Sequence, residues 1–161
     1  MSKVKIGIIK EGKIPVDKRL PLTPKKCVEA MQEFPELEVV VQPSEVRCFK
    51  DAEYEELEVE LQADLTNCDV LMGVKEVPVD ALIPNKKYFF FSHTIKKQAY
   101  NRKLLIACLE KNIELIDHET IVDHTNHRVD IASNLCMLRQ PLARDIPAHD
   151  RHAQQRGHDD D

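Results

Sequence analysis

Short apolar runs alternate with segments of helical spacing along this chain, and that alternation constrains the fold more than any other feature. The runs predicted as strands are residues 3–9, 38–41, 68–74, 87–91 and 112–116. The segments predicted as helices are residues 24–34, 52–61 and 98–111. Strands that alternate with helices favour a mostly parallel sheet with helices on both faces. The chain is therefore predicted to have an α/β fold.

Local signals support the helices. Thr23 followed by Pro24 is typical of a helix start, because Thr caps the first turn and Pro needs no N–H partner there. In the second helix, Tyr54, Leu57 and Leu61 recur at helical spacing. In the last helix, the residues predicted to face the core are Leu104, Leu105, Cys108 and Leu109.

Polar residues follow several of the predicted strands at the point where each strand ends. Lys75 and Glu76 follow residues 68–74, and His93 follows the run that ends at Phe91. Lysine at the edge of a sheet can serve as an acid or a base when its surroundings lower its pKa, and histidine is the usual proton carrier near neutral pH. If the two strands are neighbours, Lys75 and His93 face one cleft, since ligands of parallel sheets bind outside the carboxyl ends of the strands.

Taken singly, each of these residues has an ordinary structural explanation. Lys75 fits a solvated loop lysine paired with Glu76, and His93 fits a hydrogen-bonded histidine at a strand end. Arg19 lies in the loop 13–23, where its planar guanidinium suits bidentate capture of a carboxylate but also fits a surface charge.

Length and charge exclude several classes of function. The 161 residues fit one domain of ordinary size but not two full α/β domains. A net charge of −5 argues against binding to nucleic acid, which needs a clustered basic surface. No apolar stretch reaches membrane-spanning length, and the five cysteines are scattered without CxxC pairs. We therefore expect a cytoplasmic protein with free thiols, no membrane partner and no nucleic-acid partner.

No recognisable cofactor or metal motif occurs in the sequence. The four glycines are Gly7, Gly12, Gly73 and Gly157. They cannot form a GxGxxG or Walker A loop, so we expect no dinucleotide site. Histidines near the C-terminus match no defined ligand spacing, so we also expect no metal site.

The composition changes after residue 123. Residues 124–161 contain no Lys and no Glu, although they contain 5 Arg and 6 Asp. Two explanations remain open for residues 130–161: a solvated, poorly ordered tail, or translation in a shifted reading frame.

Four motifs resemble one known family. They are Lys-Ile-Gly-Ile-Ile-Lys-Glu (5–11), Asp-Lys-Arg-Leu-Pro-Leu-Thr-Pro (17–24), Gly-Val-Lys-Glu-Val-Pro (73–78) and Phe-Phe-Ser-His-Thr-Ile-Lys-Lys-Gln (90–98). Together they resemble the N-terminal domain of the alanine dehydrogenase, transhydrogenase and saccharopine dehydrogenase superfamily, a Rossmann-like substrate domain. The last motif and residues 113–129 are most similar to the lysine-forming saccharopine dehydrogenase, or lysine–2-oxoglutarate reductase, branch.

This resemblance implies roles for four residues. Arg19 matches an arginine that binds a substrate carboxylate, and Lys75 and His93 match the acid–base pair. Glu76 matches a frequently acidic neighbour of the lysine. The implied reaction is the reductive condensation of lysine with 2-oxoglutarate, or its reverse, with NAD or NADP as the hydride carrier.

The resemblance stops near Val129. Family members continue with a Gly-rich stretch and a separate nicotinamide-binding domain, which this sequence lacks. We therefore expect residues 1–129 to be the substrate domain, to bind an amino acid or a 2-oxo acid, and to be inactive as a truncated chain that binds no NAD or NADP. Alternatives are an alanine dehydrogenase-like domain or a non-catalytic binding module for the same ligands. Exposed apolar surface on an incomplete domain would allow a homodimer.

Overall fold

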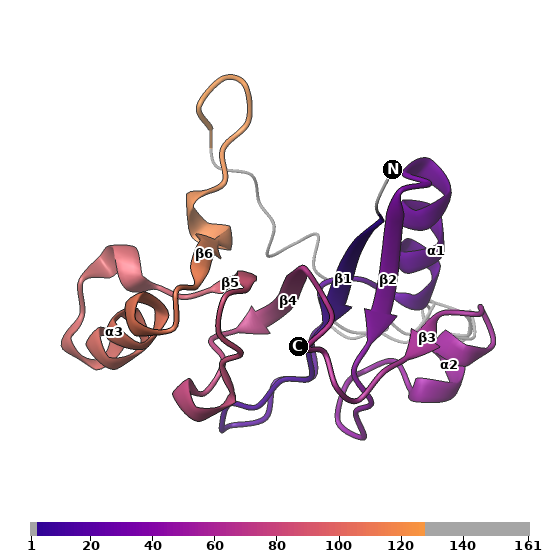
Figure 1. Cartoon of the computed structure of the whole chain (residues 1–161), viewed down its shortest axis with the longest axis horizontal. Helices are drawn as coiled ribbons and strands as arrows, with labels where there is room; N and C mark the ends of the chain where they lie inside the picture. The colour runs from indigo at the N-terminus through magenta and orange to yellow at the C-terminus, as the bar shows by residue number, and fades with distance from the viewer. Residues whose placement is uncertain (1–2, 128–161) are drawn as a thin grey trace, which may run out of the picture.

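A computed structural model describes residues 3–127, which contain a six-stranded parallel sheet of order β3-β2-β1-β4-β5-β6 (Figure 1). The strands are β1 (Val4–Ile8), β2 (Leu37–Val41), β3 (Glu60–Leu61), β4 (Val70–Lys75), β5 (Lys87–Phe91) and β6 (Glu114–Asp117). The α-helices are α1 (Pro24–Glu33), α2 (Asp51–Glu55) and α3 (Arg102–Glu110). Four short 3-10 turns are η1 (Val79–Ala81), η2 (Thr94–Lys96), η3 (Ala99–Asn101) and η4 (His118–Thr120). The predicted α/β class is confirmed.

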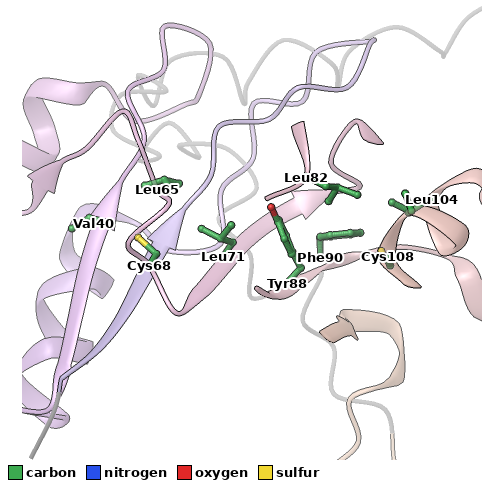
Figure 2. Packing of buried hydrophobic residues seen from close by; sticks show 10 residues of the cluster. Val40, Leu65, Cys68, Leu71, Leu82, Tyr88, Phe90, Leu104 and Cys108 are labelled. Carbon is green, nitrogen blue, oxygen red and sulfur yellow. The ribbon is translucent and has the colours of Figure 1, made fainter. Parts of the chain in front are cut away.

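The two faces of the sheet bury separate apolar clusters. On one face, Cys27 of α1 and Tyr54 of α2 pack against Val39 and Val41 of β2. On the other face, the buried side chains include Leu65, Leu71, Tyr88, Phe90 and residues of α3 (Figure 2). Adjacent residues of a strand point to opposite faces, so Val40 joins the second cluster while Val39 and Val41 join the first. Helices therefore cover both faces, as predicted.

Helix α1 follows its sequence signals closely. The Thr23 hydroxyl accepts a hydrogen bond from the backbone N–H of Lys26 at 3.2 Å, and Pro24 occupies the first turn. The helix ends at Glu33, and the N–H of Phe34 closes the last turn on Ala30. The buried Cys27 fixes this helix against the sheet.

The prediction of a helix over residues 52–61 is wrong for residues 56–61. Helix α2 ends at Glu55, and Glu58 takes the left-handed conformation with φ of 59°. The chain then buries Val59 and enters β3, where Leu61 pairs with Val41. Burial of Val59 and pairing with β2 outweigh a helix whose clustered glutamates repel one another.

Of the four residues predicted to face the core in the last helix, Leu104 and Cys108 are buried and the other two are exposed. Leu104, Ala107 and Cys108 are buried, whereas Leu105 and Leu109 remain 45% and 74% exposed. Positions 104, 107 and 108 form one helical stripe, and the neighbouring stripe at 105 and 109 turns outward.

The predicted tail, residues 130–161, lies outside the described residues, and so does the predicted domain boundary at 129. Between residues 3 and 127, no helix has both the length and the apolar character needed to cross a bilayer.

Candidate functional site

Strands β4 and β5 are adjacent, so the two residues predicted to follow neighbouring strands, Lys75 and His93, lie at the same edge of the sheet. Lys75, the last residue of β4, pairs in register with Phe91, the last residue of β5. His93 follows Phe91 by two residues. The topology therefore places Lys75 and His93 at the carboxyl ends of neighbouring parallel strands, as the sequence predicted.

A partly buried carboxylate joins the segment that follows β1 to the end of β4. Glu11 accepts the backbone N–H of Val74 at 2.7 Å and that of Lys75 at 2.9 Å. Burial raises the pKa of Glu11, whereas the two backbone bonds and the charge of Arg19 oppose that increase. Glu11 thus fixes the backbone from which the Lys75 side chain extends.

Arg19 is oriented by Asp17. The Asp17 carboxylate accepts the backbone N–H of Arg19 at 3.0 Å, its Nε at 2.9 Å and its Nη2 at 2.5 Å. These bonds lower the pKa of Asp17, and the charge of Lys75 lowers it further. Asp17 binds the Arg19 side chain and Glu11 binds the Lys75 backbone N–H, and we call these four residues the charged cluster. The charge of Arg19 acts on both carboxylates, and the charge of Lys75 acts on Asp17.

Glu76 forms an ion pair with Lys13 and has one oxygen to spare. Oε1 of Glu76 accepts the Lys13 ammonium, while Oε2 is buried without a partner among the described residues. Burial lowers the pKa of Lys13, and the positive charge of Lys75 contributes to the same shift. The side of the cluster next to Lys75 therefore carries a carboxylate oxygen that can accept a further N–H.

His93 is held in an uncommon backbone conformation. Its φ of 56° lies in the left-handed region, which few residues other than glycine adopt. The side-chain amide of buried Asn101 donates to the His93 carbonyl at 2.9 Å, and the imidazole stacks on Phe91 with 6.3 Å between ring centroids. These contacts fix the orientation of the imidazole at the end of β5.

The Glu119 carboxylate lies close to both His93 and Lys96. It lies 3.0 Å from Nδ1 of His93 and 2.9 Å from Nζ of Lys96. Burial alone would raise the pKa of Glu119, but the bonds from Lys96 and His93 outweigh it and lower the pKa. The ionised carboxylate is therefore the form that faces His93.

The end of β6 is anchored to the end of its neighbour β5 and to β4, the next strand in the sheet. Asp117 accepts the hydroxyl of buried Ser92 at 2.5 Å and the backbone N–H of Glu119 at 2.9 Å. Buried His118 reaches the carbonyl of Gly73 in β4, with 3.2 Å between Nε2 and that oxygen.

A pocket of about 350 Å³ opens beside Lys75. Its lining includes the apolar side chains of Ile9, Leu71 and Tyr88 together with the charged residues Lys75 and Glu76. The described lining includes neither Arg19 nor His93, so the single cleft predicted for Lys75 and His93 is not established by this pocket.

The described residues do not fit a nicotinamide dinucleotide. A pyrophosphate needs a short glycine-rich turn that leads directly from a strand to a helix N-terminus. Here residues 9–23 separate β1 from α1, and Pro24 supplies no N–H at the start of that helix. Among residues 3–127, no three His, Cys, Asp or Glu side chains gather as metal ligands.

Sequence reasoning places Glu11 and Glu119 among the polar residues that follow strands, but it assigns no role in the site to them or to Asp17. Two signals were present: Glu11 and Glu119 both belong to polar groups that follow strands, and Asp17 lies two residues from Arg19. Their hydrogen-bond partners, however, are set by tertiary approach across strands, which spacing along the chain does not reveal.

Comparison with known proteins identifies relatives of this architecture. Residues 7–137 match the family described as alanine dehydrogenase/PNT, N-terminal domain. Alpha-aminoadipic semialdehyde synthase of Arabidopsis thaliana is 36% identical over 124 residues, and the mitochondrial enzyme of that name from Rattus norvegicus is 40% identical over 113 residues. These matches cover 74% and 70% of this chain, which spans 12% of the length of each relative.

Solved structures share the fold. A transhydrogenase from Sinorhizobium meliloti superposes with a TM-score of 0.60 at 17% identity, over 75% of this chain and 36% of that one. An L-alanine dehydrogenase superposes with a TM-score of 0.59 at 18% identity, over 76% of this chain and 34% of that one.

Proposed function

Since the chain belongs to the alanine dehydrogenase/PNT N-terminal domain family, we propose that it is the substrate domain of an NAD(P)-dependent amino-acid oxidoreductase of the saccharopine dehydrogenase type. The resemblance predicted from the four sequence motifs is thereby confirmed at the level of the superfamily. The lysine branch is our proposal, and the alpha-aminoadipic semialdehyde synthases among the relatives support it.

One observation carries this proposal. Lys75 and Glu76 lie at the carboxyl end of β4, and His93 lies just beyond the end of the adjacent strand β5. The charges of Arg19 and Lys75 both act on the Asp17 carboxylate. Together these residues offer a guanidinium for a carboxylate and two groups able to carry protons. These are the residue types that a reaction between an amine and a 2-oxo acid needs.

We propose a role for each of these residues that the geometry supports. Arg19, oriented by Asp17, binds a carboxylate of the 2-oxo acid. Lys75, fixed through its backbone by Glu11, and His93, paired with Glu119, take and return protons as the imine forms. Glu76, which lines the pocket beside Lys75, contributes a negative charge toward the ammonium group of the amino-acid substrate. Hydride transfer would use a nicotinamide held elsewhere, because residues 3–127 provide no cradle for it.

The test is a ligand titration of the chain. We expect 2-oxoglutarate and L-lysine to shift the backbone amide signals of residues 11–19 and 74–76 in NMR spectra. Arg19→Ala is expected to weaken 2-oxoglutarate binding about tenfold or more, because a charge-assisted bond to the carboxylate is lost. Lys18→Ala is the matched control, since Lys18 is an exposed neighbouring cation. Equal affinities of the two variants would contradict the assigned role of Arg19.

The same titration separates the alternatives. Preferential binding of L-alanine and pyruvate would favour the alanine dehydrogenase-like domain. To distinguish an oxidoreductase domain from a binding module, His93→Ala and Lys75→Ala are placed in a full-length relative and turnover is measured. Loss of turnover with retained ligand binding supports the oxidoreductase, whereas wild-type turnover in both variants refutes the acid–base assignment.

Compartment and self-association remain proposals. We propose a cytoplasmic location, although the rat relative carries the word mitochondrial in its name. We also propose a homodimer, which exposed apolar side chains such as Ile95 and Tyr100 support. Light scattering of the purified chain tests the dimer, and a monomer at all concentrations would contradict it.

A further inference from the structure

His118 is a buried titratable side chain that the proposed reaction does not use. It is only 5% exposed, and it lies against Phe91 and Phe89 with ring centroids 5.1 and 6.1 Å away. Both aromatic residues belong to β5, the strand between β6 and β4. His118 therefore crosses beneath β5 to reach the carbonyl of Gly73 in β4.

The partner of Nε2 fixes the tautomer of this imidazole. A backbone carbonyl can only accept, so Nε2 carries the hydrogen that is donated to Gly73. Nδ1 is buried without a partner among the described residues, which suits the neutral ring. Burial also lowers the pKa of His118, although the bond to Gly73 and the charge of Asp117 oppose the shift.

The position of His118 in the chain joins the two halves of the proposed site. Gly73, its acceptor, precedes Lys75 by two residues on β4. Glu119, its neighbour on the other side, pairs with His93 and Lys96. A displacement of the 117–119 segment relative to β4 would therefore change the separation of the Lys75 and His93 groups.

We propose that His118 is a positioning residue, whose Nε2–H bond to the Gly73 carbonyl sets the spacing between Lys75 on β4 and the His93–Glu119 pair. The inference relies on the proposed function for the roles of Lys75 and His93. The bond itself is a property of the chain and can be tested without a ligand.

Three substitutions separate positioning from simple space filling. His118→Gln places an amide N–H where Nε2 lies and can still reach Gly73. His118→Asn places its amide closer to the backbone and cannot reach Gly73. His118→Leu fills the space between the phenylalanine rings without any donor. Space filling predicts that Leu replaces His best, whereas positioning predicts that Gln does.

The first measurement is NMR spectroscopy of the free chain. We expect imidazole ¹H–¹⁵N correlations to show the Nε2–H tautomer of His118 in the wild type. We also expect the amide signals of residues 73–75 and 119 to move in the Leu and Asn variants and to stay near their wild-type positions in the Gln variant. An Nδ1–H tautomer, or unmoved signals in the Leu variant, would overturn the proposal.

The second measurement is the affinity for 2-oxoglutarate. The Leu and Asn variants are expected to bind about fivefold more weakly, as one lost hydrogen bond predicts, and the Gln variant within about twofold of wild type. Rescue by Asn equal to that by Gln would overturn the proposal. If the wild type binds no 2-oxo acid, the proposed function fails, while the NMR experiment still decides the role of His118.

Discussion

Nδ1 of His93 lies 3.0 Å from Oε2 of Glu119, a residue that reaches it from the end of the neighbouring strand β6. The same carboxylate binds Lys96 at 2.9 Å. Because His93 immediately precedes the short turn η2 and Lys96 is its last residue, Glu119 holds both ends of that turn. The contact joins His93, the proposed proton carrier, to a residue that lies 26 positions further along the chain.

Glu119→Gln is expected to destabilise the chain in a pH-dependent way. The pKa of Glu119 is lowered from 4.5 in the folded chain, so its charge stabilises the fold above pH 4.5. That contribution is lost as the pH falls through the lowered folded pKa. We expect a difference of about 1 kcal/mol between the wild type and the variant at neutral pH, typical of a good ion pair.

Urea unfolding of both proteins at neutral pH and at acidic pH measures this difference. The gap should close at the lower pH. Glu110→Gln, at an exposed position on α3, is the control and should change little at either pH. A gap that grows on acidification would contradict the role of the Glu119 charge.

Asp17→Asn tests how the guanidinium of Arg19 is oriented. The asparagine keeps the shape of the side chain but loses the charge that binds Nε and Nη2 of Arg19. We expect affinity for 2-oxoglutarate to fall by about threefold to tenfold, because part of the ordering of the arginine must then occur on binding. Calorimetric titration measures the change.

The opposite outcome for Asp17→Asn is also informative. If Asp17 only competes with the ligand for Arg19, its neutralisation would tighten binding. Tighter binding would therefore show that the Asp17–Arg19 pair blocks the site rather than building it.

The fold could be predicted from the sequence wherever the signals were local. Thr23 and Pro24 determine the start of α1 by themselves, because capping depends on residues within one turn. The boundaries of β5 were predicted at 87 and 91, where the structure has them. In contrast, β3 and the outward stripe of Leu105 and Leu109 depend on packing against distant strands.

The candidate site was predictable in its strand ends but not in its supporting carboxylates. The alternation of strands and helices indicated that Lys75 and His93 would lie at one edge. Glu11 accepts hydrogen bonds from Val74 and Lys75, which lie 63 and 64 positions further along the chain. Glu119 contacts His93, which lies 26 positions before it. Such pairings require the register of the sheet, which one sequence does not specify.

The described thiols are expected to differ in reactivity. Burial raises the pKa of Cys27 to about 12 and also raises the pKa of Cys68 and Cys108. Cys48 is only partly buried. Since the thiolate is the reactive form, Cys48 should be alkylated at least about tenfold faster than Cys27 in the native chain.

Peptide mapping after brief alkylation measures the extent of reaction at each cysteine. Unfolding in guanidinium chloride is the control and should make the rates similar. Rapid modification of Cys27 in the native chain would contradict its burial between α1 and the sheet.

Gly73→Ala is expected to destabilise the junction of β1 and β4. A Cβ at this position would lie 2.7 Å from Cδ1 and 2.8 Å from Cγ1 of Ile9, and 3.4 Å from Oε1 of Glu11. Overpacking of this kind costs about 1–3 kcal/mol. Gly12→Ala is the control, because its Cβ would meet only Pro78 at 3.3 Å, at an exposed position.

A second substitution identifies the side chain that causes this cost. Ile9→Val removes the Cδ1 atom that the new methyl group of Gly73→Ala would meet, so the double variant should be more stable than the sum of the two single effects predicts. We expect the two substitutions to couple by about 0.5 kcal/mol or more in chemical unfolding, since the residues are in direct contact. Strict additivity would show that Cδ1 of Ile9 does not cause the cost, and that the strain falls instead on Cγ1 of Ile9 or on Oε1 of Glu11.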